Sequence, residues 1–385
     1  MYPRELKINT KRSFFLFGPR QVGKSTFLKN SFPENQVLYY NFLLNTEYMK
    51  YSSDMTLFRN QIVNRKPREK YIIVDEVQRL PEILNEVHFI LEEVKNPPVF
   101  CLSGSSARKL KRGKANLLAG RALSYKMFPL SFREIGKDFQ LTKALNFGSL
   151  PAVYSEHDTE TCKEILRSYA DTYIQEEIKS EAIVRNLSGF VSFLKLAAIH
   201  NGEILNFSSM ARETGNSQTT IKEYFQILED TLIGSFLLPY SKSFRRRLVS
   251  HPKFYFFDTG VKQSLEQKLN VELQPRTSEF GRCFEHFLFL EILKFNHYKR
   301  LDLTLSFYRT SAGAEVDLII EKPDGEIIAL EIKAKDRPYL SDVKGLFSFC
   351  ELHPKARMIC ACLTSAQYKE KNVLFIPWQE VFGIL

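Results

Sequence analysis

The sequence predicts an α/β protein of more than one domain, and three observations support this prediction. The 385 residues are enough for two or three domains, since one domain holds roughly 100–200 residues. Short, nearly all-apolar runs alternate with helix-like periodicity over the first 140 residues, as in parallel sheets covered by helices on both faces. The composition, 44% hydrophobic and 13% aromatic, supplies a core for each domain and excludes a chain that is disordered throughout.

The first predicted sheet has five strands, each separated from the next by a helix-like segment. They cover residues 13–17, 37–41, 71–74, 99–102 and 122–127. Strands that alternate with helices favour a parallel sheet, and we assign it to an α/β domain that spans residues 1–140.

The middle of the chain is predicted to be helical and its end α/β again. Helical periodicity begins near residue 155, is clearest at 161–177 and continues to about 233. A basic, aromatic segment at 239–257 is interpreted as a strand pair, and a helix is expected at 279–295. The later strands are expected at residues 306–309, 315–321, 327–333, 357–363 and 373–376.

Charge and cysteine usage limit the classes of partner and compartment. The formal net charge of +10 makes an anionic partner plausible without naming it. The six cysteines form no CxxC pairs and show no even spacing, which favours reduced core residues over disulfides. No run approaches the ~18 apolar residues of a membrane span, so we expect a cytoplasmic protein with no membrane partner.

Residues 18–25 read G-P-R-Q-V-G-K-S and match the P-loop pattern G-x-x-x-x-G-K-[ST] between a predicted strand and a helix-like run. In this pattern glycines let backbone N–H groups face phosphate oxygens, Lys24 reaches the β and γ phosphates, and Ser25 can bind Mg²⁺. The predicted nucleotide-binding residues are Gly18, Pro19, Arg20, Gln21, Val22, Gly23, Lys24, Ser25 and Thr26.

A second element of the nucleotide site is the strand at 71–74, which ends in Asp75 and Glu76. Asp75 would hold the Mg²⁺, and Glu76 could polarise the attacking water as a general base, which favours a hydrolase over a kinase. No motif that reads a guanine base is evident, so the residues alone leave ATP and GTP open.

The strand at 99–102 is followed by S-G-S-S, which places Ser103 either as a sensor of the γ-phosphate or in a plain serine turn. Beyond it lies a run of basic residues without an acid: Arg108, Lys109, Lys111, Arg112, Lys114 and Arg121. This run either follows a nucleic-acid backbone or forms a solvated loop. Arg121 could instead complete the ATP site of a neighbouring subunit as an arginine finger, which would require a homo-oligomer.

Residues 207–232 have the pattern of a helix-turn-helix. A first helix at 207–214, a glycine turn at 215–217 and a second helix from 218 place apolar side chains at core spacing, with Ser217 as the cap of the second helix. The segment that follows is basic, with Arg245, Arg246 and Arg247 as candidate DNA contacts. The second helix also carries acids, so DNA reading and a role in protein contacts both stay open.

In the last third, the loop P-D-G at 323–325 separates two strands that carry charges at alternate positions. A three-residue hairpin loop pairs residue 322 with 326 and therefore sets Asp317 opposite Glu331, on one face with Lys333. The two carboxylates would hold Mg²⁺ or Mn²⁺, and Lys333 would stabilise an attacking hydroxide or a pentacovalent phosphate. The alternative is a cross-strand ion pair between Glu315 and Lys333 beside solvated acids.

Together these motifs resemble the bacterial and archaeal AAA-type ATPases with a P-loop, D-E-x-Q, G-S-S and G-R-x…P-L-S-F-x-E segments. Here the last three are found at 75–78, 103–106 and 120–134. The resemblance covers essentially the whole chain and implies ATP as the nucleotide. It also implies four parts, namely an ATPase domain at 1–140, a helical lid at 141–180, a winged helix at 181–261 and a PD-(D/E)XK nuclease-like domain at 262–385.

Within this resemblance Asp317, Glu331 and Lys333 match the D…E-x-K core of the nuclease fold, and Glu285 matches an additional acid on the preceding helix. Two functions follow. The first is an oligomeric, ATP-driven enzyme that binds and processes DNA, with the C-terminal centre either cutting DNA or only holding it. The second is a signal-transducing nucleotide switch whose C-terminal domain binds a partner or DNA without cleavage.

Overall fold

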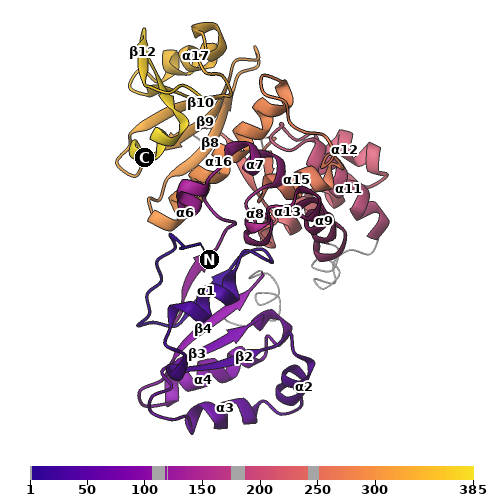
Figure 1. The fold of residues 1–385 in the computed structure, drawn as a ribbon, viewed down its shortest axis with the longest axis vertical. Coiled ribbons are helices and arrows are strands. Elements are labelled where there is room, and N and C mark those ends of the chain that lie inside the picture. The colour runs from indigo at the N-terminus through magenta and orange to yellow at the C-terminus, as the bar shows by residue number, and fades with distance from the viewer. Residues whose placement is uncertain (1, 106–117, 119, 175–186, 242–250) are drawn as a thin grey trace. The chain divides into compact units, whose positions relative to one another are not determined.

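The computed structural model describes residues 2–105, 118, 120–174, 187–241 and 251–385. The described residues form two compact units (Figure 1). Unit 1 comprises Met1–Leu130 with Ile227–Ile233, and unit 2 comprises Ser131–Gln226 with Gly234–Leu385. The predicted lid and the predicted C-terminal domain therefore fall into the same unit.

Unit 1 contains the predicted parallel sheet. Its strands are β1 (Phe14–Phe17), β2 (Val37–Asn41), β3 (Tyr71–Asp75), β4 (Val99–Gly104) and β5 (Leu123–Lys126). They are all parallel in the order β2-β3-β4-β1-β5, so the P-loop strand lies between β4 and β5. The five strands match the predicted ranges to within two residues at either end, which confirms the first sheet.

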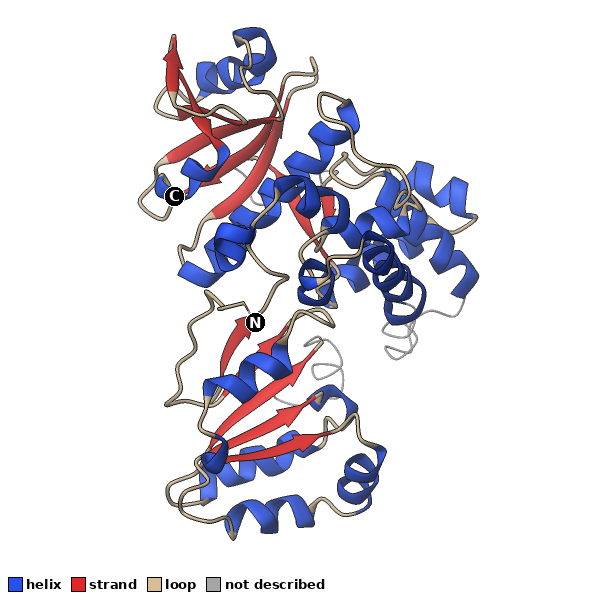
Figure 2. Cartoon of the chain, viewed as in Figure 1, coloured by secondary structure: helices blue, strands red, loops and turns tan. Residues whose placement is uncertain are grey.

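Helices complete unit 1 (Figure 2). They are α1 (Lys24–Ser31), α2 (Asn45–Ser53), α3 (Thr56–Val63), α4 (Ile83–Glu93) and the 3₁₀ turns Glu34–Gln36 and Val77–Arg79. An apolar cluster joins alternate strand residues such as Phe15 and Val74 to Phe58 of α3 and Val87 of α4. One face of the sheet is thus covered by α3 and α4, while α1 contacts β4.

Unit 2 is built on an eight-stranded mixed sheet with the order β12-β13-β11-β10-β9-β8-β6-β7. The strands are β6 (Gly234–Pro239), β7 (Lys253–Phe256), β8 (Thr304–Arg309), β9 (Glu315–Glu321), β10 (Ile327–Lys333), β11 (Arg357–Cys362), β12 (Tyr368–Glu370) and β13 (Val373–Pro377). β6 pairs with β7 as a hairpin and also runs parallel to β8. The first strand of the predicted pair at 239–257 therefore ends at Pro239 rather than beginning there: residues 234–237 pair with β7, and Leu238 and Pro239 pair with β8.

The helices of unit 2 come from three stretches of the chain. They are α6 (Phe132–Ile135), α7 (Leu141–Phe147), α8 (Pro151–Ser155), α9 (Thr159–Ser168), a π-helical turn (Tyr169–Ile174), α11 (Leu187–Ile199), α12 (Phe207–Thr214), α13 (Gln218–Asp230), α15 (Thr259–Leu265), α16 (Ser278–Lys299), α17 (Lys344–Leu352) and 3₁₀ turns at Gly136–Asp138, Leu340–Val343 and Trp378–Gly383. The last residues of α13 are grouped with unit 1.

The predicted helix-turn-helix is present locally as α12 and α13. Gly215 ends α12 with a φ of 64°, a conformation that glycine adopts without strain. Ser217 accepts a hydrogen bond at its Oγ from the backbone N–H of Thr220 at 3.0 Å, which is the predicted cap of α13.

Asp258 joins the segment 141–155 to the C-terminal helices inside unit 2. Its carboxylate accepts hydrogen bonds from Val261 N at 3.0 Å, which caps α15, and from Ser149 N at 2.8 Å. α7 contacts both α15 and α16. A side chain at Gly148 would lie 2.0 Å from the Asp258 carboxylate, so this junction requires a glycine.

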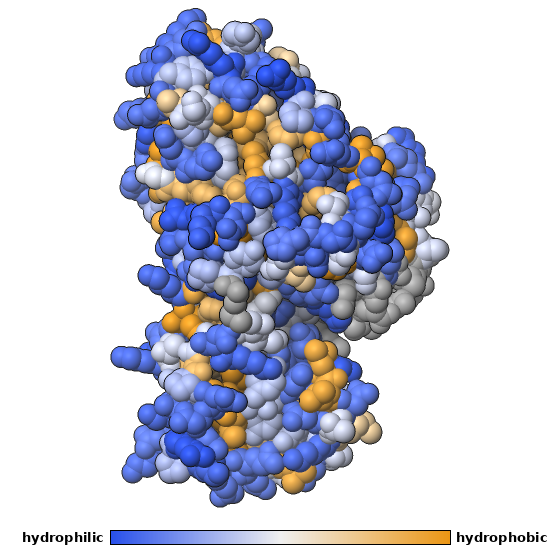
Figure 3. All heavy atoms as spheres, in the orientation of Figure 1, coloured by the Kyte–Doolittle hydropathy of each residue, from blue (hydrophilic) through white to orange (hydrophobic). Residues whose placement is uncertain are grey.

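The visible surface is mostly hydrophilic, with apolar side chains in separate patches (Figure 3). Three exposed apolar residues, Leu43, Leu44 and Met49, lie together along the chain at the start of α2. Among the helices that the structure describes, none is both long enough and apolar enough to span a membrane.

Candidate functional site

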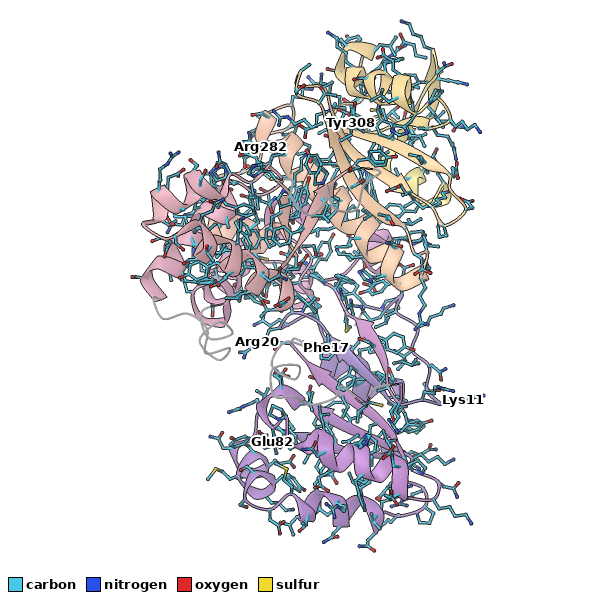
Figure 4. The ribbon with its side chains drawn as sticks, turned by 180° about the vertical axis from the view of Figure 1, so that it is seen from behind. Lys11, Phe17, Arg20, Glu82, Arg282 and Tyr308 are labelled. Atoms are coloured by element: carbon cyan, nitrogen blue, oxygen red, sulfur yellow. The ribbon has the colours of Figure 1, made fainter. Side chains whose placement is uncertain are left out.

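The P-loop occupies residues 18–23 between β1 and α1, and Phe17 and Arg20 of this region are labelled in Figure 4. Two of its residues have left-handed backbones, Gln21 with a φ of 62° and Gly23 with a φ of 92°. A side chain at Gly18 would lie 2.3 Å from the carbonyl oxygen of Met127, so only glycine fits there. The residue before α1, Gly23, has no side chain to cap this helix, whose first turn holds Lys24, Ser25 and Thr26, and the N-terminus of a helix favours an anion.

Lys24 is 5% exposed and turns back onto its own loop. Its Nζ donates hydrogen bonds to the carbonyl oxygens of Gly18 at 2.7 Å and Pro19 at 2.9 Å. The ammonium group is therefore held at the mouth of the loop by neutral oxygens. Phosphate oxygens would be stronger acceptors for the same N–H groups, because hydrogen bonds between charged groups are the strong ones.

Asp75, the predicted Mg²⁺ ligand, is 2% exposed, and each of its carboxylate oxygens is engaged by a hydroxyl group. Ser103 donates to Oδ1, and Tyr39 donates to Oδ2 at 2.6 Å. Burial, followed by the hydrogen bond and charge of Asp75, raises the pKa of Tyr39 well above its usual value, while a hydrogen bond with Ser25 opposes this shift. Of the predicted residues, Ser25 and Asp75 thus contact Tyr39, and Ser103 contacts Asp75.

Tyr39 is absent from the residues that the sequence predicts for this site. It lies on β2, which is next to β3 in the sheet, with Asn41 paired to Asp75. A polar aromatic residue near the end of the neighbouring strand is the only signal that could have found it, and that signal requires the strand order.

Glu76, the predicted general base, has a left-handed backbone with a φ of 60° and is 8% exposed. The side chain of Gln78 holds it: Nε2 donates to Glu76 Oε2 at 2.5 Å and to Ser105 Oγ at 3.1 Å. A side chain at Gly104 would lie 2.4 Å from Gln78 Oε1, so glycine at the end of β4 makes room for this amide. Gln78 therefore connects the base to the residue that follows the sensor strand, a link that the sequence did not predict.

Arg121 and the P-loop lie at opposite ends of the parallel strands. It precedes β5, whose first residue pairs with Phe14 at the start of β1, whereas the P-loop follows the end of β1. Its guanidinium group pairs with Glu92 in the last turn of α4. Arg121 is therefore not part of the nucleotide site of its own chain, and its action on a neighbouring subunit stays a prediction.

The other basic candidates cannot be placed. Arg108, Lys109, Lys111, Arg112, Lys114, Arg245, Arg246 and Arg247 lie outside the described residues.

In unit 2 the predicted hairpin register is confirmed. Lys322 N donates to Glu326 O at 2.9 Å, and the ladder runs from Ile327 opposite Glu321 to Leu330 opposite Leu318. The regular pairing ends there, one residue before Asp317 and Glu331. Asp317 uses its Oδ2 to accept a hydrogen bond from Ile332 N at 2.8 Å instead.

A β-bulge adjoins this point on the other side of β9. Ser306 of β8 pairs with Ile319 and Tyr308 pairs with Val316, so Asp317 and Leu318 together face a single residue of β8. Bulges of this kind redirect a side chain and are common next to functional sites. The bulge and the carboxylate hydrogen bond both set the direction of Asp317.

Glu331 and Lys333 form a buried ion pair beside Asp317. Lys333 Nζ lies 2.5 Å from Glu331 Oε1 and 3.7 Å from Asp317 Oδ2. Glu331 is 5% exposed, and its Oε2 is buried without a hydrogen-bond partner among the described residues. Burial and the charge of Asp317 raise the pKa of Glu331 to about 8, although Lys333 opposes the shift. A buried carboxylate oxygen without a partner fits a divalent cation.

The predicted third acid, Glu285, is engaged elsewhere. Glu285 Oε1 accepts a hydrogen bond from the Tyr255 hydroxyl at 2.6 Å and lies 3.4 Å from Lys253 Nζ. Within the described ranges, no group of three or more His, Cys, Asp or Glu side chains is arranged to hold a metal ion. Glu285 therefore contacts Tyr255 and Lys253 in this structure, and its role as a metal ligand stays a prediction.

The alternative ion pair between Glu315 and Lys333 is also replaced by other contacts. Glu315 pairs with Lys253 at 2.7 Å and with Arg309 at 3.3 Å. Lys333 instead faces Glu331 and Asp317.

Comparison with known families divides the chain into three matched segments. Residues 10–136 match a family model described as an AAA domain. Residues 138–272 match a domain of unknown function, DUF8612, and residues 280–381 match another, DUF4143.

The similar curated proteins are themselves uncharacterised. One from Mycobacterium tuberculosis is 24% identical over 332 residues, which cover 85% of this chain and 71% of that protein. One from Haemophilus influenzae is 24% identical over 82% of this chain and 80% of that protein. One from Methanocaldococcus jannaschii is 25% identical over 84% of this chain and 75% of that protein.

Two solved structures show low overall similarity. A signal transduction ATPase with numerous domains (STAND) and a tetratricopeptide repeat sensor, from Pyrococcus horikoshii, is 14% identical with a TM-score of 0.22, covering 78% of this chain and 52% of that one. A DNA polymerase III gamma subunit-related protein from Thermotoga maritima is 13% identical with a TM-score of 0.24, covering 74% and 95%. Neither similarity supports an argument at these TM-scores. The match to an AAA domain, together with the P-loop and the parallel sheet around it, identifies the N-terminal segment as a P-loop ATPase domain.

Proposed function

We propose that the protein is an oligomeric enzyme that couples ATP hydrolysis to the binding and processing of DNA. The observation that carries this proposal is the presence, in one chain, of a P-loop site and a separate centre where the structure, over the residues it describes, leaves a buried carboxylate oxygen without a partner. The first suits a nucleotide with Mg²⁺, and the second suits a cation that activates phosphodiester cleavage.

At the ATP site each residue has a distinct task. The α1 N-terminus and Lys24 bind phosphate oxygens, Ser25 and Asp75 hold Mg²⁺, and Ser103 orients Asp75. The Mg²⁺ supplies charge neutralisation at the β and γ phosphates. Glu76 accepts the proton of the attacking water once Gln78 has released its carboxylate.

At the C-terminal centre Asp317 and Glu331 would hold Mg²⁺ or Mn²⁺, and Lys333 would stabilise negative charge on the phosphate. The cation supplies a nucleophilic hydroxide at neutral pH. Residues 262–385 would then act as a nuclease-like domain, preceded by a winged helix at 181–261 and a lid at 141–180. The basic residues outside the described ranges would contact DNA phosphates, and Arg121 would complete the ATP site of the next subunit. A cytoplasmic location is part of this proposal.

One observation favours a second function. Lys24 and Glu76 are both held by groups of their own site, a carbonyl pair and the Gln78 amide. A nucleotide switch, whose turnover is slow until a partner arrives, would use such restraints. In that case the C-terminal centre would bind a partner or DNA without cutting it.

The first experiment measures ATP hydrolysis with Mg²⁺, alone and with single-stranded, duplex or branched DNA, and uses Lys24→Ala as the blank. Stimulation by one form of DNA supports the proposed enzyme. A rate that no DNA changes, together with no affinity for DNA at low salt, overturns it in favour of the switch.

The second experiment follows cleavage of labelled DNA with Mg²⁺ or Mn²⁺. Lys333→Ala should abolish cleavage and leave ATP hydrolysis unchanged. Cleavage by that variant at the rate of the unmodified protein would remove the nuclease assignment.

A further inference from the structure

A cavity of about 350 Å³ opens in unit 2 beside the Asp317–Glu331 centre. Its walls combine the turn at residues 201–204 and β7 with the first part of α16 and the facing ends of β8 and β9. The charged and hydroxyl groups that line it are Glu203, Lys253, Tyr255, Arg282, Glu285, Arg309 and Glu315. Arg282 and Tyr308, labelled in Figure 4, mark α16 and β8 in this region.

Lys253 is the most buried cation of this cavity. It is 3% exposed, and its Nζ lies 2.7 Å from Glu315 Oε1 and 3.4 Å from Glu285 Oε1. Burial lowers the pKa of Lys253, but the negative charges of Glu285 and its neighbours outweigh burial and keep the pKa above its usual value. The ammonium group therefore bridges two carboxylates in a site that solvent reaches through the cavity.

The bridge joins two sequence segments that match different families. Lys253 and Tyr255 lie within the segment 138–272, whereas Glu285 and Glu315 lie within the segment 280–381. The β6–β7 hairpin reaches them because β6 extends the sheet of β8 and β9. A residue of the first segment is thus built into the site of the second.

Lys253 offsets part of the negative charge in this region. Four carboxylates, Glu285, Glu315, Asp317 and Glu331, share this region with the ammonium groups of Lys253 and Lys333. The charges of Asp317 and Lys333 act on Glu285, which shows that the two ion pairs form one electrostatic cluster. Without Lys253, Glu285 would lose its ammonium partner and Glu315 would keep only Arg309, at 3.3 Å, so the net negative charge next to Asp317 would rise.

We propose that Lys253 is a positioning residue of the C-terminal centre, which occupies Glu285 and Glu315 so that a divalent cation binds only at Asp317 and Glu331. This inference rests on the proposed function of that centre. Tyr255 assists by holding Glu285 Oε1 at 2.6 Å. The cavity gives a cation access to Glu285 and Glu315 as soon as the lysine is removed.

The test measures Mn²⁺ binding to nucleotide-free full-length protein by electron paramagnetic resonance of free Mn²⁺. Lys253→Met should bind Mn²⁺ at least tenfold more tightly or bind an additional ion, because a positive charge within a few ångströms of the acids is lost. Lys253→Arg should restore the affinity and stoichiometry of the unmodified protein.

Lys262→Met is the matched control. Lys262 is also a buried lysine that pairs with carboxylates, Glu266 at 2.5 Å and Glu279 at 3.4 Å. Its partners are not those of Lys253, so Mn²⁺ binding should stay within about twofold of the unmodified protein.

If Lys253→Met fails to fold, Glu315→Gln tests the same idea with the opposite sign. It leaves the charge of Lys253 less compensated, and Mn²⁺ binding should weaken several-fold. Mn²⁺ affinity and stoichiometry that stay unchanged in folded Lys253→Met, or in Glu315→Gln when the former does not fold, overturn the proposal. If the unmodified protein shows no Mn²⁺ binding that Asp317→Asn removes, the proposed C-terminal centre itself fails.

Discussion

The nucleotide site of unit 1 and the acidic centre of unit 2 are prepared for a cation in different ways. Both oxygens of Asp75 are engaged by protein hydroxyl groups, from Tyr39 and Ser103. Glu331 has one oxygen on Lys333, and its other oxygen is buried without a partner among the described residues. The carboxylate in unit 1 is thus satisfied without a ligand, and the one in unit 2 is not.

The two sites also differ in how the chain assembles them. The groups of unit 1 follow the ends of adjacent parallel strands, which brings their side chains to one edge of the sheet. The groups of unit 2 come from β7, α16, β9 and β10. Their positions depend on the β-bulge between β8 and β9 and on the point where the pairing of β9 with β10 ends. A site at strand ends can be predicted from local motifs, whereas the second depends on long-range pairing.

The largest expected effect is the loss of nucleotide binding in Lys24→Ala. The variant removes the ammonium donors at the P-loop, and hydrogen bonds to charged groups are worth ~1.5–3 kcal/mol each, so affinity should fall by roughly a hundredfold. Titration with a fluorescent ATP analogue measures this, and Lys66→Ala, at an exposed position of unit 1, serves as the control. Equal affinity in both variants would contradict the assignment of Lys24.

The second effect sharpens the contrast between satisfied and unsatisfied carboxylates. Added Mn²⁺ should stabilise unit 2 of nucleotide-free protein by ~2.7 kcal/mol at a hundred times its Kd, and Glu331→Gln should lose this gain. Denaturation followed by the fluorescence of Trp378, the single tryptophan and a buried residue of unit 2, reports on this unit alone. Equal stabilisation in Asp324→Asn, at the exposed hairpin tip, confirms that the effect belongs to the centre.

The third effect is the dependence of the stability of unit 2 on pH, through His286. Burial lowers the pKa of His286 to about 3, and its Nε2 lies 2.6 Å from the carbonyl oxygen of Phe256 in β7. Since the folded pKa is depressed, the unfolded chain binds the proton first, and stability is lost as pH falls below ~6.5. Between pH 7 and pH 5 the contribution of His286 to the stability of unit 2 should fall by about 2 kcal/mol, measured by Trp378 fluorescence in urea as the difference between the unmodified protein and a variant without this histidine.

His286→Gln provides the control for this pH dependence, since glutamine does not titrate. From pH 7 to pH 5 the urea midpoint of the unmodified protein should fall relative to that of this variant. An identical change in both proteins would assign the acid sensitivity to other groups.

The smallest effect tests the nucleotide site, where both oxygens of Asp75 accept hydrogen bonds. Tyr39→Phe removes the donor to Asp75 Oδ2, and the loss of such an outer partner of a metal ligand typically costs 10–100-fold in metal affinity. We expect ATP binding to need an Mg²⁺ concentration about tenfold higher for the same effect, while ATP binding in EDTA should stay unchanged. Tyr40→Phe, the next residue of β2 and part of the apolar core, should leave both values unaltered.

The residues that the sequence predicts are those in local motifs, and the contacts that it does not predict depend on long-range pairing. The P-loop, Asp75 and Glu76 are recognisable because each lies within a short motif after an apolar strand. Tyr39 was missed, and the contact made by Gln78 of the D-E-x-Q segment was not predicted, because these roles depend on strand order and on the space left by Gly104. The hairpin register was predictable from its loop, but the contact between Glu285 and Lys253 was not, because Lys253 lies 32 residues before it in the chain.

The pairing of β6 with β8 has a practical consequence for dividing the protein into fragments. Leu238 and Pro239 pair with Ser306 and Phe307, so β8 has a neighbour on each side in the intact chain. A fragment that starts at residue 262 would lack β6 and β7, expose the edge of β8 and tend to aggregate through it. Fragments that retain residues from Gly234 onward keep that edge paired and should be more soluble.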